Sequence, residues 1–173
     1  MFRLTLKYVL PFIFLHATFV NAKEVNESLK EALTCGIDPL GNIRAIVASG
    51  SNFKKGYAST SYGDGIENTV VVTLEKPIEI YGAKTFAVIG SADNSLFFDF
   101  NGIVYAKFVG DYKKVVSALN LTETKDTEIK TGRFQRKLTI DSDGKPYETC
   151  PMKIGLTPLI NNEFVLGCGW CNG

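Results

Sequence analysis

The arrangement in this sequence that most resembles a catalytic motif is Cys168-Gly169-Trp170-Cys171, which has Cys-x-x-Cys spacing. Such a pair supports thiol–disulfide exchange when the first thiol stands at a helix N-terminus, which lowers its pKa. Because the motif lies so near the end of the sequence, we expect no helix after it, and no βαβ pattern precedes it. We therefore interpret both cysteines as parts of structural disulfides, together with Cys35 and Cys150.

Four cysteines allow three disulfide pairings. The last two predicted strands would form an antiparallel hairpin, which places Cys150 opposite the region of Cys168 and Cys171. On that ground we favour Cys150–Cys168 with Cys35–Cys171. The alternative, Cys168–Cys171 with Cys35–Cys150, would give a local bridge and would support a redox function.

The amino-terminal segment decides which catalytic residues remain. Residues 1–22 contain basic Arg3 and Lys7, a mostly apolar stretch and a small residue before a cleavage point, which together are typical of a secretory signal peptide. The stretch is shorter than the roughly 20 apolar residues of a bilayer-spanning helix, so we expect cleavage after Ala22 and no permanent membrane anchor. Cleavage removes His16, the only histidine, and leaves 17 basic against 18 acidic residues. A mature chain without histidine has no Ser-His-Asp triad, no Cys-His pair and no His-ligated zinc.

Other patterns that could carry chemistry are weak. Asp141-Ser142-Asp143-Gly144 predicts a turn rather than a calcium loop, because Lys145-Pro146 stands where further oxygen ligands are needed. Carboxylate pairs could serve acid–base catalysis, but none falls in a recognisable motif. These pairs are Asp64 with Glu67, Asp93 with Asp99, and Glu75 with Glu79. There is no glycine-rich nucleotide-binding spacing, and the nearly balanced charge argues against a nucleic-acid partner. We therefore expect no catalytic residue, no metal and no cofactor.

Residues 50–66 form the longest polar stretch, and its four glycines predict an open loop. Its content of tyrosine, serine, glycine and lysine is typical of binding loops, in which aromatic rings supply contact area at low entropic cost. We choose Tyr57 and Tyr62 as the anchors of a partner contact. The candidate contact residues are Lys54, Lys55, Tyr57, Tyr62 and Asp64. The alternative is a loop without a binding role.

The rest of the chain is dominated by short strand signals separated by turns. Strands are expected at residues 43–49, 69–74, 78–80, 84–89, 96–100, 103–109, 133–140, 149–156 and 163–167. Two helices are expected, one over residues 25–34 that ends at Gly36, and one that begins after an Asp111 cap. Residues 23–173 are therefore predicted to form one α+β domain, with a mainly antiparallel sheet of about six to eight strands and one helix packed on it.

These expectations favour a small exported, disulfide-bonded, non-catalytic protein that binds a protein partner in the periplasm or outside the cell. An inhibitor or immunity protein that acts on another envelope macromolecule is one form of this function. The alternative is an exported enzyme that uses carboxylates, or a thiol–disulfide oxidoreductase that uses the C-terminal cysteine pair. The sequons at Asn26 and Asn120 would matter only in a eukaryotic source.

Overall fold

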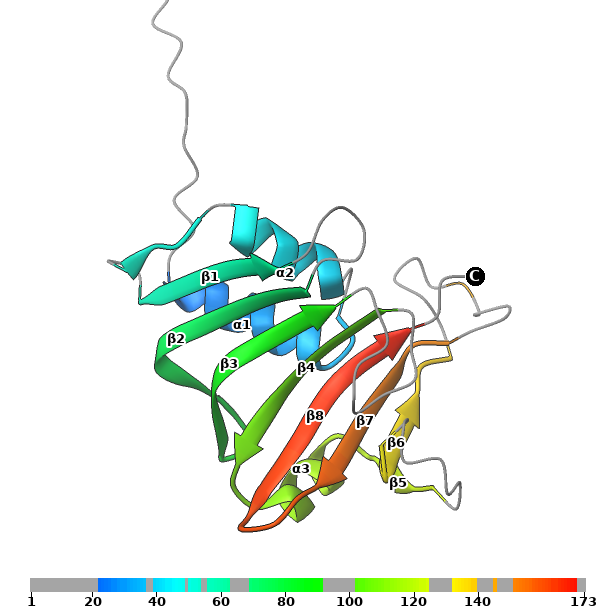
Figure 1. Cartoon of the computed structure of the whole chain (residues 1–173). Helices are drawn as coiled ribbons and strands as arrows, with labels where there is room; N and C mark the ends of the chain where they lie inside the picture. Colours follow the sequence, from blue (N-terminus) through cyan, green and yellow to red (C-terminus); the bar gives the residue numbers. More distant parts are fainter. Residues whose placement is uncertain are drawn as a thin grey trace, which may run out of the picture.

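The computed structural model describes residues 22–36, 39–48, 50–53, 56–62, 69–91, 102–124, 132–139, 145 and 151–170. Within these ranges the elements are α1 (Ala22–Leu33), α2 (Pro39–Ala48), β1 (Tyr57–Tyr62), β2 (Thr69–Ile80), β3 (Ala83–Ser91), β4 (Gly102–Val109), α3 (Tyr112–Ala118), β5 (Thr122–Glu123), β6 (Phe134–Lys137), β7 (Lys153–Pro158) and β8 (Glu163–Trp170). The strands form one eight-stranded sheet in the order β1-β2-β3-β4-β8-β7-β6-β5, and all neighbours are antiparallel (Figure 1). The predicted α+β class and antiparallel sheet are confirmed, with one helix more than expected.

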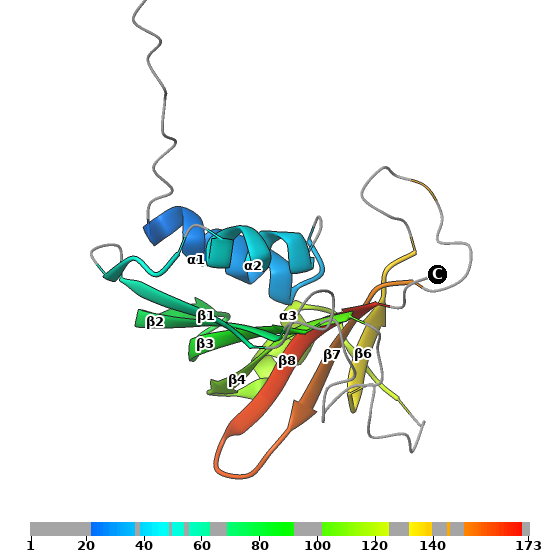
Figure 2. The same cartoon turned by 45° about the horizontal axis from the view of Figure 1, so that its top comes forward.

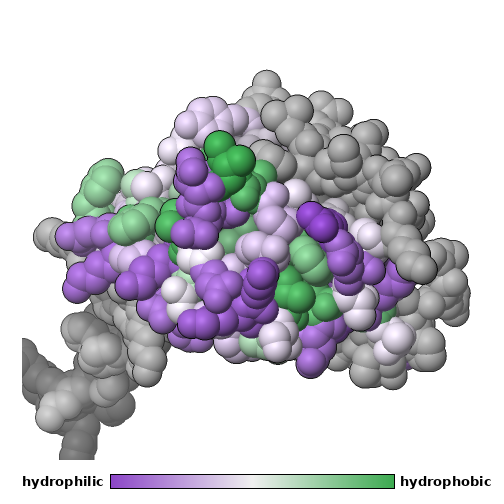
Figure 3. All heavy atoms as spheres, turned by 90° about the horizontal axis from the view of Figure 1, so that it is seen from below, coloured by the Kyte–Doolittle hydropathy of each residue, from purple (hydrophilic) through white to green (hydrophobic). Residues whose placement is uncertain are grey.

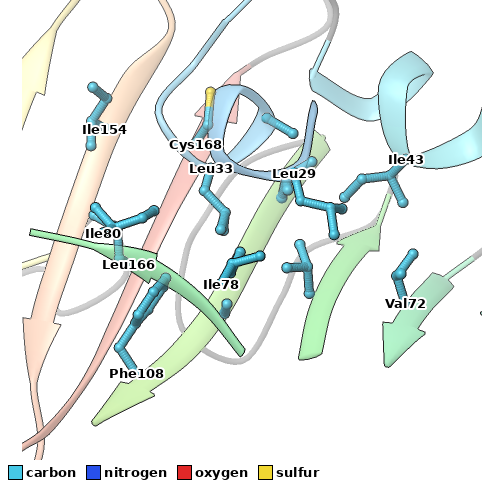
Figure 4. Packing of buried hydrophobic residues seen from close by; sticks show 14 of the residues in the cluster. Leu29, Leu33, Ile43, Val72, Ile78, Ile80, Phe108, Ile154, Leu166 and Cys168 are labelled. Carbon is cyan, nitrogen blue, oxygen red and sulfur yellow. The ribbon is translucent and has the colours of Figure 1, made fainter. Parts of the chain in front are cut away.

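The helices α1 and α2 lie side by side over one face of the sheet (Figure 2). Their apolar side chains meet those of the central strands in a continuous core. Figure 4 shows Leu33 of α1 on the side of Leu166 and Phe108, and Ile43 of α2 on the side of Val72 in β2; all of these side chains are fully buried. Each such side chain stabilises the fold by about 1.5–3 kcal/mol through apolar burial. The core therefore fixes α1 and α2 to the middle of the sheet.

The segment predicted as a strand at residues 43–49 is instead helical up to Ala48, the last residue of α2, so that prediction was wrong. Ile43 and Ile46, three residues apart, are buried, whereas Arg44 and Ala45 between them are exposed. This is helical spacing, which places the two isoleucines on one face toward the sheet. Pro39 is the first residue of the helix, where the fixed φ of proline is favourable. The β-branched residues of the segment misled the prediction because packing against the sheet outweighs their modest helix propensity.

The end of α1 differs by one residue from the prediction. Cys35, not Gly36, has the left-handed conformation, with φ of 60°. The Gly36 N–H donates to the Glu31 carbonyl at 2.7 Å, which closes the helix with a Schellman-type bond. A Cβ atom on Gly36 would lie 2.9 Å from Glu31 Cβ, so glycine is needed there for close approach.

The Cys35 sulfur is bonded to Cys168 of β8, with a Cα–Cα distance of 5.0 Å and a sequence separation of 133. Neither pairing considered from the sequence contains this bond, and both were wrong. The β7–β8 register explains why, because it places Ile154 opposite Cys168, on the sheet face that α1 covers. Cys150 and Cys171 lie outside the described residues. The bond itself fits an oxidising, exported environment.

Other predictions are confirmed or fall outside the described part of the chain. Asp111 caps α3, and its Oδ1 accepts a hydrogen bond from the Lys113 N–H at 3.0 Å. Strands were found at β2, β3, β4, β6, β7 and β8 near their predicted ranges. Residues 1–21, which hold all of the predicted signal segment 1–22 except Ala22, and the predicted strand at 96–100 lie outside the description. Among the described helices, none is long and apolar enough to cross a membrane.

Candidate functional site

The segment predicted as an open binding loop contains strand β1, at one edge of the sheet. Tyr57 is only 3% exposed and belongs to the core beneath α2, so it cannot anchor a partner without unfolding the edge. Tyr62, which is 60% exposed, points to the opposite face because five residues separate it from Tyr57 in a strand. The predicted pair of anchors is therefore wrong, although Tyr62 itself is accessible. Lys54, Lys55 and Asp64 lie outside the described residues.

The first half of the β1 edge is covered by the chain that precedes it. Asn52 and Tyr57 exchange backbone hydrogen bonds of 3.1 and 3.3 Å. The Ser51 hydroxyl bonds both the carbonyl and the N–H of Ser59, each at 3.0 Å. These bonds occupy the outward-facing backbone groups that a partner strand would need, which is one way in which proteins protect sheet edges.

The opposite edge is built differently, because β5 has only two residues. Its register pairs Thr122 with Gln135. If the pairing continued by two residues on each strand, Asn120 would lie opposite Lys137. Asn120 has a left-handed φ of 53°, and its N–H donates to Ser117 in the last turn of α3. The chain therefore turns away before it can pair with Lys137. Strand β6 continues past the end of its neighbour.

The backbone of Lys137 faces this open edge. The Gln135 carbonyl points toward β5, where it accepts a hydrogen bond from the Thr122 hydroxyl at 3.2 Å. The Leu138 N–H points the other way and donates to Met152 at 2.9 Å. Because backbone groups alternate in direction along a strand, the N–H and C=O of Lys137 point outward, like those of Gln135. No described residue pairs with them.

A hollow of about 400 Å³ lies at this point, which is within the range of small-ligand and side-chain pockets. It is bordered by the polar residues Asn120, Thr122, Thr124, Gln135, Arg136 and Lys137. The Gln135 side-chain amide donates to the Gly132 carbonyl at 2.9 Å, which fixes one wall. The hollow thus offers hydroxyl and amide groups next to the Lys137 backbone, whose outward groups have no partner in the described part of the chain.

The charge around the hollow is positive among the described residues. The Lys137 side chain is exposed and has no ion-pair partner there. Arg136 points to the other sheet face, where its Nε is buried without a hydrogen-bond partner in the described part of the chain. The carboxylate of Glu123, on the adjacent strand, is already bound by Arg133 Nε at 2.8 Å. An acidic group of a partner would therefore be attracted by the Lys137 ammonium group, which no described carboxylate neutralises.

The described residues give no support to the two catalytic alternatives, the Cys-x-x-Cys redox motif and the carboxylate pairs. Cys168 is fully buried and bonded to Cys35, so the Cys-x-x-Cys spacing does not present a local, reactive bridge. Of the carboxylate pairs, Glu75 and Glu79 lie within the described residues, and both are exposed. Glu79 lies 3.8 Å from the Lys84 ammonium group, as in an ordinary surface ion pair. The other two pairs lie outside the description.

The sequence predicted the β6 strand but not the site. The signal that could have found it is the sequence Leu119-Asn120, because asparagine tolerates the left-handed conformation that ends a helix and diverts the chain. Comparison with known proteins finds no matching family model, no similar curated protein and no similar solved structure.

Proposed function

We propose that this chain is an exported, disulfide-bonded, non-catalytic protein that binds a protein partner through the open edge of β6. The observation that carries the proposal is the outward-facing backbone of Lys137, which is unpaired among the described residues, beside the polar hollow. It contrasts with the first half of β1 at the other edge, where Asn52 and Ser51 occupy the outward groups of Tyr57 and Ser59. An inhibitor or immunity protein acting in the envelope is one form of such a binder.

The mode of binding that this geometry supports is strand addition. An extended segment of the partner would accept a hydrogen bond from the Lys137 N–H and donate one to the Lys137 C=O. One of its side chains would enter the hollow between Asn120 and Gln135. An aspartate or glutamate is favoured there, because the Lys137 ammonium group is unpaired among the described residues and Arg136 adds positive charge from behind the sheet.

Export is supported by the Cys35–Cys168 disulfide, which fits an oxidising compartment. The predicted signal segment at residues 1–22 supports it from the sequence side. N-terminal sequencing of the exported protein is expected to find Lys23 as the first residue. Recovery of an intact Met1 on a membrane-inserted product would contradict export by cleavage.

The test uses one substitution at each edge of the sheet. Lys137→Pro removes the outward N–H without breaking a ladder bond to β7, because that group points away from the sheet. Ser61→Pro is the matched control, since Ser61 follows Ser59 by two residues and its N–H also points outward, at the opposite edge. Each purified mature protein is used to capture partners from the native envelope.

A partner captured by the wild type and by Ser61→Pro, but lost with Lys137→Pro, would support strand addition at β6. Lys137→Ala keeps the backbone N–H and removes the charge, so it should weaken capture without abolishing it. Equal capture by Lys137→Pro and the wild type would overturn the proposal. Circular dichroism of each variant confirms that the fold is retained.

A further inference from the structure

A second surface lies at the end of the sheet where three chain segments meet. These are the β2–β3 turn, the corner after β4, and the β7–β8 turn, which projects furthest in Figures 1 and 2. Gly110, at the corner after β4, contacts both other segments. Its N–H donates to the Asn162 carbonyl of the β7–β8 turn at 2.9 Å, and a Cβ on it would lie 2.8 Å from the Cα of Ala83 at the start of β3. The register also pairs Val109 with both Lys84 and Glu163.

Large apolar side chains stand exposed at this end, which we call the turn tip. The turn tip consists of Tyr81, Val109, Leu159 and Ile160, which are 53%, 55%, 38% and 77% exposed. Turns are usually built from small polar residues, so apolar side chains on neighbouring turns form an unusual group. Figure 3 views this end of the molecule from below and shows separate hydrophobic patches surrounded by hydrophilic side chains.

The conformation of Tyr81 adds an independent observation. Tyr81 and Gly82 connect Ile80 to Ala83 with φ angles of 49° and 86°, as in a type I′ turn. The first position of such a turn favours asparagine or glycine, and a bulky aromatic residue there is strained. The fold therefore holds a tyrosine outward at a position where a smaller residue would be more stable, which points to a function for the ring.

The charge near the turn tip is positive among the described residues. Its glutamates are neutralised, because Glu79 pairs with Lys84 at 3.8 Å and Glu163 with Lys107 at 2.9 Å. Asp111 serves as the cap of α3. Lys113 and Lys114 follow in the first turn of that helix; both are exposed, and neither has an ion-pair partner in the described part of the chain.

We propose that the turn tip is a peripheral contact for an anionic lipid surface. The protruding turns would place Ile160, Val109 and Tyr81 at the level of the headgroups, where tyrosine and aliphatic side chains are favoured. Lys113 and Lys114 would then face the negative surface of the bilayer. A convex group of separate tips suits a deformable bilayer better than a flat protein surface. This contact is independent of the β6 edge and leaves that edge free for a partner.

The test is co-sedimentation of the mature protein with vesicles of mixed phosphatidylglycerol and phosphatidylcholine, compared with vesicles of phosphatidylcholine alone. Ile160→Ser should weaken binding to the mixed vesicles about tenfold, because it removes a large apolar side chain from the contact. Phe53→Ser is the control, because Phe53 is 78% exposed but precedes β1 at the edge of the sheet and is not on any of the three turn-tip segments. Lys114→Gln should weaken binding about fivefold, and Lys76→Gln on β2 serves as its control.

Tyr81→Asn separates the lipid contact from a structural role. It should raise the melting temperature, since asparagine suits the turn, and yet lower vesicle binding. The proposal is supported if the turn-tip variants lose binding to the mixed vesicles while Phe53→Ser and Lys76→Gln keep it. It is overturned if the wild type does not bind mixed vesicles better than phosphatidylcholine alone. It is also overturned if Ile160→Ser leaves vesicle binding unchanged and instead weakens capture of a protein, which would assign the turn tip to a protein partner.

Discussion

The Cys35–Cys168 bond closes most of the described chain into one loop, and its removal should be the most destabilising change made at the cysteines. The two residues are 133 positions apart. For a loop of that length, the chain-entropy model gives about 5 kcal/mol of stabilisation through restriction of the unfolded state. Small domains have only about 5–15 kcal/mol in total. The Cys35→Ala/Cys168→Ala variant should therefore lose most of its stability or fail to fold at 37 °C.

The assay is equilibrium unfolding in urea without reductant, followed by circular dichroism. The control is Cys150→Ala/Cys171→Ala. If those two cysteines are bonded, their separation of 21 residues gives about 3 kcal/mol in the same model, so the control should be the milder variant. The reasoning would be refuted if the Cys35/Cys168 double variant lost less than about 1 kcal/mol of unfolding free energy. It would also be refuted if the Cys150/Cys171 control proved to be the less stable of the two variants. Non-reducing peptide mapping checks the bond directly, and a Cys35–Cys171 peptide would contradict the fold described above.

Further predictions concern single residues. Because Cys35 and Cys168 are bonded to each other, Cys150 and Cys171 are each other's remaining partner within the chain, and mapping of the oxidised protein should recover that peptide. Asp111→Ala should cost about 0.5–2 kcal/mol through loss of the α3 cap, and Asp111→Asn should cost less, as measured in urea. Gly167→Ala should cost about 1–3 kcal/mol, because its Cβ would lie 2.5 Å from the Val104 carbonyl oxygen and 2.7 Å from Tyr105 Cβ. Burial raises the pKa of Tyr105 above its ordinary value of 10.0, so the folded state favours the neutral phenol. The free energy of unfolding should fall as pH rises above 10, and Tyr105→Phe should reduce that fall; an equal fall in both proteins would contradict the assignment.

Elements whose stability is local were predictable from the sequence. Asp111 followed by an apolar face at helical spacing identifies α3, because the cap and the periodicity act within a few residues. Alternation of apolar and polar residues, interrupted at Arg136, identifies β6, and the hydrophobic runs identify β2 and β8. These signals sufficed for the α+β class and an antiparallel sheet.

The errors arise where a distant part of the chain decides the structure. Tyr57 belongs to a glycine-rich stretch, but it becomes a core residue because α2 covers that edge of the sheet. The disulfide partner of Cys35 depends on the register that places Cys168 under α1. The site at Lys137 depends on where α3 ends, since a β5 strand two residues longer would have closed it. Single-sequence patterns do not contain these tertiary relations.

The measurement that tests partner binding at the β6 edge most directly is amide hydrogen exchange at Lys137, by NMR, with and without the partner captured by the wild type. In the free protein the Lys137 N–H should exchange fast, whereas the Leu138 N–H, bonded to Met152 at 2.9 Å, should exchange slowly. In the complex the Lys137 N–H should become protected and the Leu138 N–H should remain so. A Lys137 N–H that exchanges equally fast in both states would contradict strand addition at this edge.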